Sequence, residues 1–118
     1  MVAAIRADLA QFTGSATLYR HRLGLHYTEG VRHLAERCAA YWLLDLIGAW
    51  LPEVRLDRKA KDFCVWRIKV RPGCEADVTC DDGDGRVVAR QHLSFTDFPL
   101  AEATLYLEYG TLMLPSER

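Results

Sequence analysis

Apolar residues recur at helical spacing between residues 28 and 51, and this pattern predicts the longest element of the chain. Val31 and Leu34 begin one apolar face, and the second half of the segment is apolar nearly all round. Thr28 is a suitable N-cap, because its hydroxyl can accept from a free amide of the first turn. Pro52 bounds the segment. We therefore expect one long, buried central helix.

Two segments, 63–70 and 74–80, alternate between apolar and polar residues and are joined by Arg71-Pro72-Gly73. This pattern predicts a β-hairpin with a three-residue loop. Pairing Val70 with Cys74 fixes the register and matches both faces of the hairpin. On the polar face Arg67 would lie opposite Asp77 and Lys69 opposite Glu75, and on the apolar face Cys64 would lie opposite Cys80.

A third strand follows the turn at residues 82–85. Pairing Asp81 with Arg86 places Val87 opposite Cys80 and Arg90 opposite Asp77. The three strands form an antiparallel meander with one apolar and one charged face. We expect the central helix to cover the apolar face.

The two ends of the chain are patterned more weakly. Residues 8–12 predict one helical turn that ends at Thr13-Gly14-Ser15, and residues 17–27 predict a short hairpin that turns near Leu23-Gly24. Asp97 and Pro99 predict the start of a short C-terminal helix that ends at Gly110. Residues 112–114 predict a last strand. The expected fold is α+β, with an antiparallel meander packed against one long central helix and a short C-terminal helix.

Composition is consistent with one globular domain over residues 1–118. Half of the 118 residues are apolar, 26% are charged and the net charge is −1. These values exclude disorder as the main state and give no overall basic or acidic excess for nucleic-acid binding or DNA mimicry. We expect no membrane span, because no apolar run is long enough. We also expect no export signal and a cytoplasmic location. The apolar content leaves a homodimer open.

Asp45 stands out as the one acid within the apolar run of the central helix. A buried carboxylate must be paired or protonated. Asp45 is therefore a candidate for a buried polar site with Arg20 and His21, as an acid, a base or a ligand-binding group. The alternative, which we favour, is a structural ion pair with Arg20 or His21, or exposure at the helix edge.

Two groups of charged residues are candidate interaction surfaces. Arg20, Arg22, Arg32 and Arg37 make the N-terminal third locally basic. Arg67, Lys69, Glu75, Asp77 and Arg90 share the charged face of the meander. The spacing of histidines and of the four cysteines matches no zinc site, and the acidic turn at residues 82–85 does not match a calcium loop. We therefore expect no metal, no cofactor and no catalytic residues.

Six short segments form a recognisable series along the chain. They are Gln11-Phe12-Thr13-Gly14, Tyr19-Arg20-His21, Tyr27-Thr28-Glu29-Gly30-Val31, Tyr41-Trp42-Leu43-Leu44-Asp45, Thr96-Asp97-Phe98-Pro99-Leu100 and Leu112-Met113-Leu114-Pro115-Ser116-Glu117. In this order they resemble a family of small bacterial proteins of unknown function found on phages, plasmids and other mobile elements. The resemblance spans nearly the whole chain, except that Arg118 stands where the family pattern has an aromatic residue and that the cysteines are not part of it.

The resemblance implies a setting rather than an activity. It favours a small, non-enzymatic accessory protein of a mobile element that binds a host or element-encoded protein. Such a protein could inhibit a host defence system of the CRISPR or restriction type. Two alternatives remain: a small enzyme or ligand-binding protein with a pocket around Asp45, and a nucleic-acid-binding accessory protein that uses Arg20, Arg22, Arg32 and Arg37.

Overall fold

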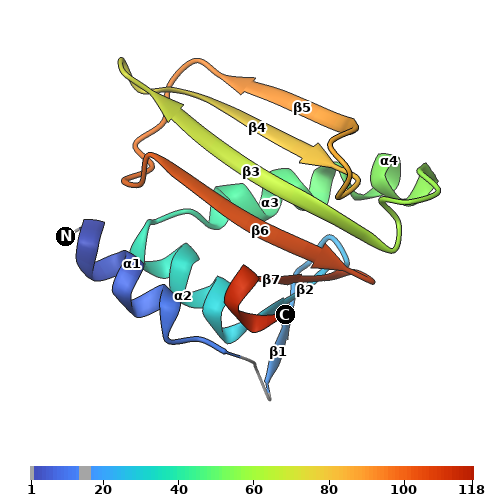
Figure 1. Ribbon diagram of the computed structural model, residues 1–118, viewed down its shortest axis with the longest axis horizontal. Coiled ribbons are helices and arrows are strands. Elements are labelled where there is room, and N and C mark those ends of the chain that lie inside the picture. The colour runs from blue at the N-terminus through green and yellow to red at the C-terminus, as the bar shows by residue number, and fades with distance from the viewer. Residues whose placement is uncertain (1, 14–16) are drawn as a thin grey trace.

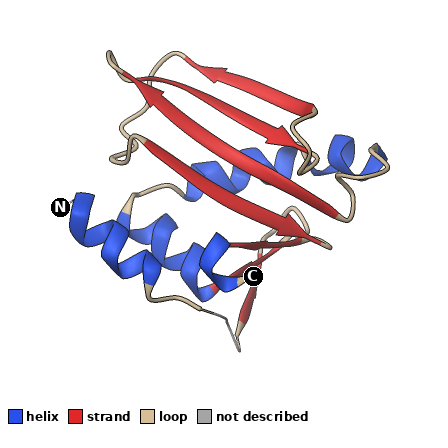
Figure 2. Ribbon diagram, viewed as in Figure 1, coloured by secondary structure: helices blue, strands red, loops and turns tan. Residues whose placement is uncertain are grey.

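The computed structural model describes residues 2–13 and 17–118 of the chain and shows an α+β fold with a mixed sheet (Figures 1 and 2). In chain order its elements are α1 (Val2–Ala10), β1 (Leu18–Arg20), β2 (His26–Thr28), α2 (Glu29–Arg37), α3 (Tyr41–Ala49), α4 (Leu51–Leu56), β3 (Phe63–Arg71), β4 (Glu75–Asp81), β5 (Val87–Leu93), β6 (Glu102–Glu108), β7 (Thr111–Met113) and the 3-10 helix η1 (Pro115–Glu117).

One sheet of seven strands organises the molecule, in the order β1-β2-β7-β6-β3-β4-β5. All neighbouring strands are antiparallel except β2 and β7, which run parallel. Strand β3 lies between β6 and β4 and is paired along most of its length. The expected three-stranded meander β3-β4-β5 is therefore part of a larger mixed sheet.

The core lies between the helices and one face of this sheet. In Figure 1, α3 lies behind the strands and α1 and α2 lie side by side below β6. Fully buried side chains of the helices, such as Val31 and Ile47, join those of the strands, such as Trp66 and Val78, in one apolar cluster. Among the described residues, no helix lies on the opposite face of β3, β4 and β5 (Figure 2).

The prediction of one long central helix is wrong, because the chain breaks between α2 and α3. Cys38 is the C-cap of α2, and Ala39 has a left-handed φ of 49°. The amide of Ala40 donates to the carbonyl of Ala35 at 2.8 Å, which is the bond that closes a Schellman motif. This motif usually has glycine at the left-handed position. With alanine there, the apolar pattern runs through the break without a visible signal.

The prediction of a short C-terminal helix is also wrong, because residues 102–108 form strand β6. Leu105 and Leu107 are buried and alternate with more exposed neighbours, as in a strand with one face on the core. The residues Tyr109 and Gly110 both have positive φ and form the two-residue turn into β7. Pairing with β3 on one side and β7 on the other decides the conformation of this segment.

The β3-β4 hairpin exists, but its register is two residues from the predicted one. Val70 pairs with Ala76 and not with Cys74, because residues 72–74 form the loop and both Gly73 and Cys74 have positive φ. A shift of two residues keeps each side chain on its predicted face. The predicted pairing of β4 with β5 is also wrong, because Cys80 lies opposite Ala89 and not Val87, and Asp77 lies opposite His92 and not Arg90. The register shifts between Cys80 and Asp81, so Val87 pairs with Asp81.

The N-terminal segments are closer to expectation. The hairpin of β1 and β2 is confirmed, and its turn includes Gly24 with a φ of 105°. Helix α1 starts earlier than the predicted turn at residues 8–12 and ends at Ala10. Gly14 and Ser15, which were predicted to end that turn, lie outside the described residues.

The start of α2 is held by a carboxylate from the other end of the chain. One oxygen of Glu117, Oε1, accepts from the Thr28 hydroxyl at 2.6 Å and from the Leu114 amide at 2.9 Å, and Oε2 accepts from the Gly30 amide at 3.3 Å. A Cβ on Gly30 would lie 2.6 Å from Oε1 of Glu117, so a larger residue there would displace this carboxylate. Two of the segments that carry the family resemblance thus meet at this contact.

Candidate functional site

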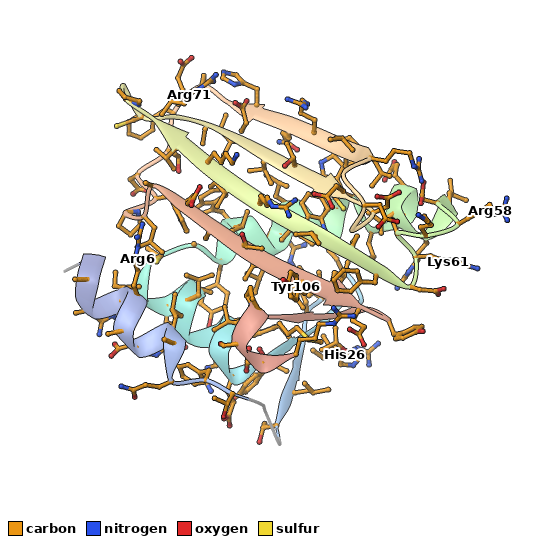
Figure 3. The ribbon with its side chains drawn as sticks, viewed as in Figure 1. Arg6, His26, Arg58, Lys61, Arg71 and Tyr106 are labelled. Carbon is orange, nitrogen blue, oxygen red and sulfur yellow. The ribbon has the colours of Figure 1, made fainter. Side chains whose placement is uncertain are left out.

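The helix-free face of the sheet holds a groove of about 500 Å³ over strands β3, β4 and β5. Its side chains are the polar ones that alternate with the core residues of the same strands. Figure 3 shows Arg71 at the end of β3 that borders this groove. The lining residues are Arg67, Lys69, Arg71, Asp77, Thr79, Asp81, Gly85, Val87 and Arg90.

Two carboxylates in this groove, Asp77 and Asp81, are paired with basic side chains of the protein. Arg67 bonds the carboxylate of Asp81, whose side chain is only 8% exposed. Arg71 Nη1 lies 3.4 Å from Asp77 Oδ2, and His92 Nδ1 lies 3.1 Å from Asp77 Oδ1. The hydrogen bond with His92, followed by the nearby charges of Arg71 and Arg90, lowers the pKa of Asp77. Both carboxylates are therefore already engaged by the protein's own side chains.

Lys69 and Arg90 differ from these paired residues. Both are exposed, and neither forms an ion pair within residues 2–13 and 17–118. With Arg67 and Arg71 they make the groove positively charged, because only Asp77 and Asp81 among its lining residues are acidic. Lys69 and Arg90 are thus the side chains best placed to bind an external carboxylate or phosphate.

The sequence identified Arg67, Lys69, Asp77, Arg90 and Glu75 on this face. Glu75 lies at the rim, where its Oε1 is 3.5 Å from His92 Nε2. Sequence reasoning missed Arg71 and Asp81. The predicted register placed Arg71 in the loop and paired Arg67 with Asp77. In the structure, β3 extends one residue further, to Arg71, and β4 extends to Asp81. A register that included Arg71 opposite Glu75 would have found both residues.

The proposed buried site around Asp45 is a different arrangement. His21 is buried, and its Nε2 lies 2.7 Å from Asp45 Oδ1, whereas the Asp45 side chain is 46% exposed. Arg22, and not Arg20, is the arginine near this carboxylate, with Nη2 3.8 Å from Oδ1. Arg20 is exposed on β1. The cluster thus contains His21, Asp45 and Arg22.

Both nitrogens of His21 are already used. The Leu23 amide donates to Nδ1 at 3.1 Å, so the ring proton is on Nε2 and is donated to Asp45. A histidine that acts as a general base needs a free ring nitrogen that faces a substrate, and His21 has none. Gly48 lets the loop that carries His21 lie against α3, since a Cβ there would be 3.0 Å from Leu23 Cβ. This geometry is typical of a pair that fixes a loop to a helix.

The arginines of the N-terminal third do not form one surface. Arg32 Nε lies 3.1 Å from Glu36 Oε1, and the Arg32 guanidinium stacks over Tyr19 at 4.7 Å. Arg37 Nη1 lies 3.6 Å from Asp8 Oδ2. Because Arg22 is near Asp45, three of the four predicted arginines are close to acidic side chains.

The acidic turn between β4 and β5 is held by hydrogen bonds within the protein. Asp82 Oδ1 accepts from the amides of Asp84 and Arg86 at 2.9 and 3.2 Å, and Lys59 pairs with Asp84. Arg86 also reaches Asp57 at 2.5 Å. In the described part of the chain, no group of three His, Cys, Asp or Glu side chains is arranged to hold a metal ion.

The cysteines are free thiols in the described chain. Cys64 and Cys80 are fully buried, and a hydrogen bond between them together with burial raises the pKa of Cys80. A thiol with a raised pKa is a poor nucleophile at neutral pH. This pair therefore packs as part of the core.

Comparison with known proteins identifies the family. The model of DUF6876, a family of unknown function, matches residues 3–118, and the chain belongs to this family. No curated protein matches the chain, and no solved structure does. Arg118, which stands where the resemblance predicts an aromatic residue, stacks its guanidinium over the ring of Phe63 at 4.2 Å. It thus packs on an aromatic surface, as an aromatic residue could.

Proposed function

We propose that this member of DUF6876 is a non-enzymatic protein that acts by binding another protein through the positively charged groove of its open sheet face. The observation that carries the proposal is the pair of exposed cations, Lys69 and Arg90, next to paired carboxylates. The partner surface that fits this groove presents carboxylates. A groove in which Arg67 is already paired with Asp81 loses little freedom on binding, which favours affinity.

The setting implied by the resemblance completes the proposal. The partner is a host or element-encoded protein in the cytoplasm, and the protein is an accessory product of a mobile element that inhibits a host defence complex of the CRISPR or restriction type. No helix in residues 2–13 and 17–118 has the length and apolarity that a membrane crossing requires. Whether the protein binds its partner as a homodimer is a separate prediction.

The enzyme and nucleic-acid alternatives have less support. At Asp45 both nitrogens of His21 are occupied, so His21 is not available as a proton acceptor, and the carboxylate itself is half-exposed beside Arg22 rather than enclosed in a pocket. Nucleic-acid binding would need a continuous basic surface, and Arg22, Arg32 and Arg37 lie beside carboxylates. The open face itself mixes both charges, which suits a protein surface better than a phosphate backbone.

The test is capture of a partner with a matched pair of charge-reversal variants. The Lys69→Glu/Arg90→Glu variant reverses the charge of the proposed contact. The control, Arg58→Glu/Lys61→Glu, makes the same change in net charge at two exposed cations that do not line the groove (Figure 3). A protein that is captured from a bacterial host lysate by the wild type and the control, but not by the Lys69/Arg90 variant, supports the proposal.

Two results would count against it. If both variants capture the same proteins as the wild type, the groove is not the contact. If affinity for duplex DNA falls steeply with salt and is lost in the Lys69/Arg90 variant, the ligand is nucleic acid. Expression in cells with an active defence system adds a functional readout, because an inhibitor raises the plating efficiency of phage.

A further inference from the structure

Strand β6 has an unpaired edge in the interior of the sheet. It pairs with β3 from Glu102 to Glu108, whereas β7 on its other side pairs only with Tyr106, Leu107 and Glu108. Within the described chain, residues 102–105 of β6 have no strand neighbour on the β7 side. The sheet therefore has a gap next to β6, where β7 would lie if it were longer.

The end of β7 explains this gap. The next residue after Leu114 is Pro115, which has no amide to donate, and the chain turns into η1 there. The Leu114 amide donates to the Glu117 side chain at 2.9 Å and not to β6. The same carboxylate that holds the start of α2 thus turns the chain away from β6.

The backbone groups of β6 point into the gap at two residues. The Val70 amide donates to the Ala101 carbonyl at 2.8 Å, so Ala101 faces β3. Backbone direction alternates along a strand, so Ala103 also faces β3, and the amide and carbonyl groups of Glu102 and Thr104 point to the open side. None of these four groups has a backbone partner in the part of the chain that the structure describes.

An apolar groove of about 310 Å³ lies along this edge, between α1 and β6. Leu9 and Ala10 of α1 line one side of the groove, and Leu100, before β6, and Leu114, after β7, also line it. Arg6 lies at the end of the groove near the beginning of β6 (Figure 3). Arg6 is exposed and forms no ion pair within residues 2–13 and 17–118.

We propose that this edge binds an extended segment of a partner protein, which adds to β6 as a short antiparallel strand. The unpaired groups of Glu102 and Thr104 supply main-chain hydrogen bonds, as in other complexes formed by strand addition. An apolar side chain of the segment fills the groove beside Leu9, and a carboxylate at the segment's C-terminal end binds Arg6. This site is on a different surface from the charged groove and does not depend on the proposed function.

The test uses random heptapeptides displayed on phage and selected on the whole protein. Enriched peptides are expected to alternate apolar residues with others and to have Asp or Glu near the C-terminal end. When a synthetic copy of an enriched peptide binds, amide exchange at Glu102 and Thr104 is expected to slow at least tenfold in NMR spectra. Exchange at these two amides is expected to be fast in the free protein.

Matched variants assign the binding to the groove. Ala10→Phe fills the groove from an exposed position of α1 and is expected to weaken peptide binding at least tenfold. Ala7→Phe adds the same ring at an exposed position of α1 that does not line the groove, and it is expected to leave binding unchanged. Arg6→Glu is expected to change the preferred terminal residue from acidic to basic.

Several results would overturn the proposal. These are the absence of any enriched peptide, equal binding to the Ala10→Phe variant, and unprotected amides at Glu102 and Thr104 in the complex. A concentration-dependent dimer that Ala10→Phe abolishes would show that a second copy is the occupant, and this also contradicts the proposal. The Lys69→Glu/Arg90→Glu variant is expected to bind the peptide as the wild type does, because these residues do not line the groove beside β6. This variant therefore distinguishes a failure of the strand-addition proposal from a failure of the proposed function.

Discussion

Asp57 connects the loop after α4 with the turn between β4 and β5. Its Oδ1 accepts from the amides of Ala60 and Lys59 at 2.9 and 3.0 Å, and its Oδ2 accepts from Arg86 at 2.5 Å. The amide of Ala60, followed by Arg86, lowers the pKa of Asp57 from 3.8 to about 2. Because the folded pKa is below the unfolded one, the ionised carboxylate stabilises the fold above about pH 4.

Asp57→Asn is therefore expected to lower the urea midpoint at neutral pH and to have less effect in acid. The stabilising contribution of Asp57 is lost as the pH falls through its folded pKa of about 2, so the two midpoints converge between about pH 4 and pH 2. Urea denaturation over this pH range measures the difference. Asp84→Asn, at an exposed ion pair, is the control and should change the midpoint little. A constant gap at every pH would contradict this account.

Ala39 is the second residue with a distinct local role. It has a left-handed φ of 49°, is exposed and ends α2 in a Schellman motif. A left-handed conformation costs roughly 1 kcal/mol for a residue with a Cβ, and glycine does not pay this cost.

Ala39→Gly is expected to raise the free energy of unfolding by about 0.5–1 kcal/mol, after the greater entropy of glycine in the unfolded chain is subtracted. Thermal or urea unfolding measures the change. Ala7→Gly, inside α1, is the control and should lower the free energy of unfolding by roughly the same amount. If both substitutions destabilise equally, the break after α2 is not where the structure has it.

At the scale of elements, the N-terminus of α2 depends on the C-terminus of the chain. Glu117 accepts hydrogen bonds from Thr28, Gly30 and Leu114, and its negative charge lies at the positive end of the α2 dipole. The Thr28 hydroxyl in turn accepts from the Val31 amide at 3.2 Å. A single carboxylate thus orders both α2 and η1.

Glu117→Ala is expected to lower the free energy of unfolding by about 1–2 kcal/mol, the range for loss of a helix cap. Glu117→Gln keeps one oxygen that can accept from Thr28 and Leu114, but loses the charge and the acceptor for Gly30, and is therefore expected to lose less than Glu117→Ala. Urea denaturation of the three proteins gives the order. Equal stability of the wild type and Glu117→Ala would show that the contact does not hold α2.

The predictability of each element depended on whether its signal was local. Alternation in residues 63–70 and 74–80 was enough to find β3 and β4, but the turn residues placed the loop at 71–73, one residue before the observed loop at 72–74. The break at Ala39 gave no signal, because the usual glycine is absent. Strand β6 was mistaken for a helix because its neighbours β3 and β7 are distant in sequence, and pairing with them overrides the local pattern.

The charged face was predictable for a similar reason. Polar residues of β3 and β4 alternate with core residues, so a register error of two positions kept Arg67, Lys69 and Asp77 on the correct face. The partners within that face were not predictable, because Asp81 pairs with Arg67 only in the observed register. The contact between His21 and Asp45 was predictable, because a lone acid in an apolar run needs a partner, whereas the choice of Arg22 over Arg20 as the nearby arginine was not.

At the scale of the whole molecule, the sheet has one face in the core and one face that is open to solvent. The helices and one face of the sheet form the core (Figure 1), and on the opposite face of β3, β4 and β5 Lys69 and Arg90 are exposed, whereas Asp81 is buried. Formal charge is nearly balanced over the chain, so the positive charge of Lys69 and Arg90, which form no ion pair with any described residue, is a local property of the groove. A partner that binds this groove would therefore recognise the positive charge of Lys69 and Arg90 at their fixed places on the sheet.

The central claim is that this groove is the contact with a protein partner, and calorimetric titration of the purified partner tests it most directly. We expect Lys69→Glu/Arg90→Glu to weaken binding at least tenfold and Arg58→Glu/Lys61→Glu to change it less than twofold. Thermal unfolding of both variants should match that of the wild type, so that a loss of binding reports on the surface. Equal affinity of the two variants for the partner would contradict the claim.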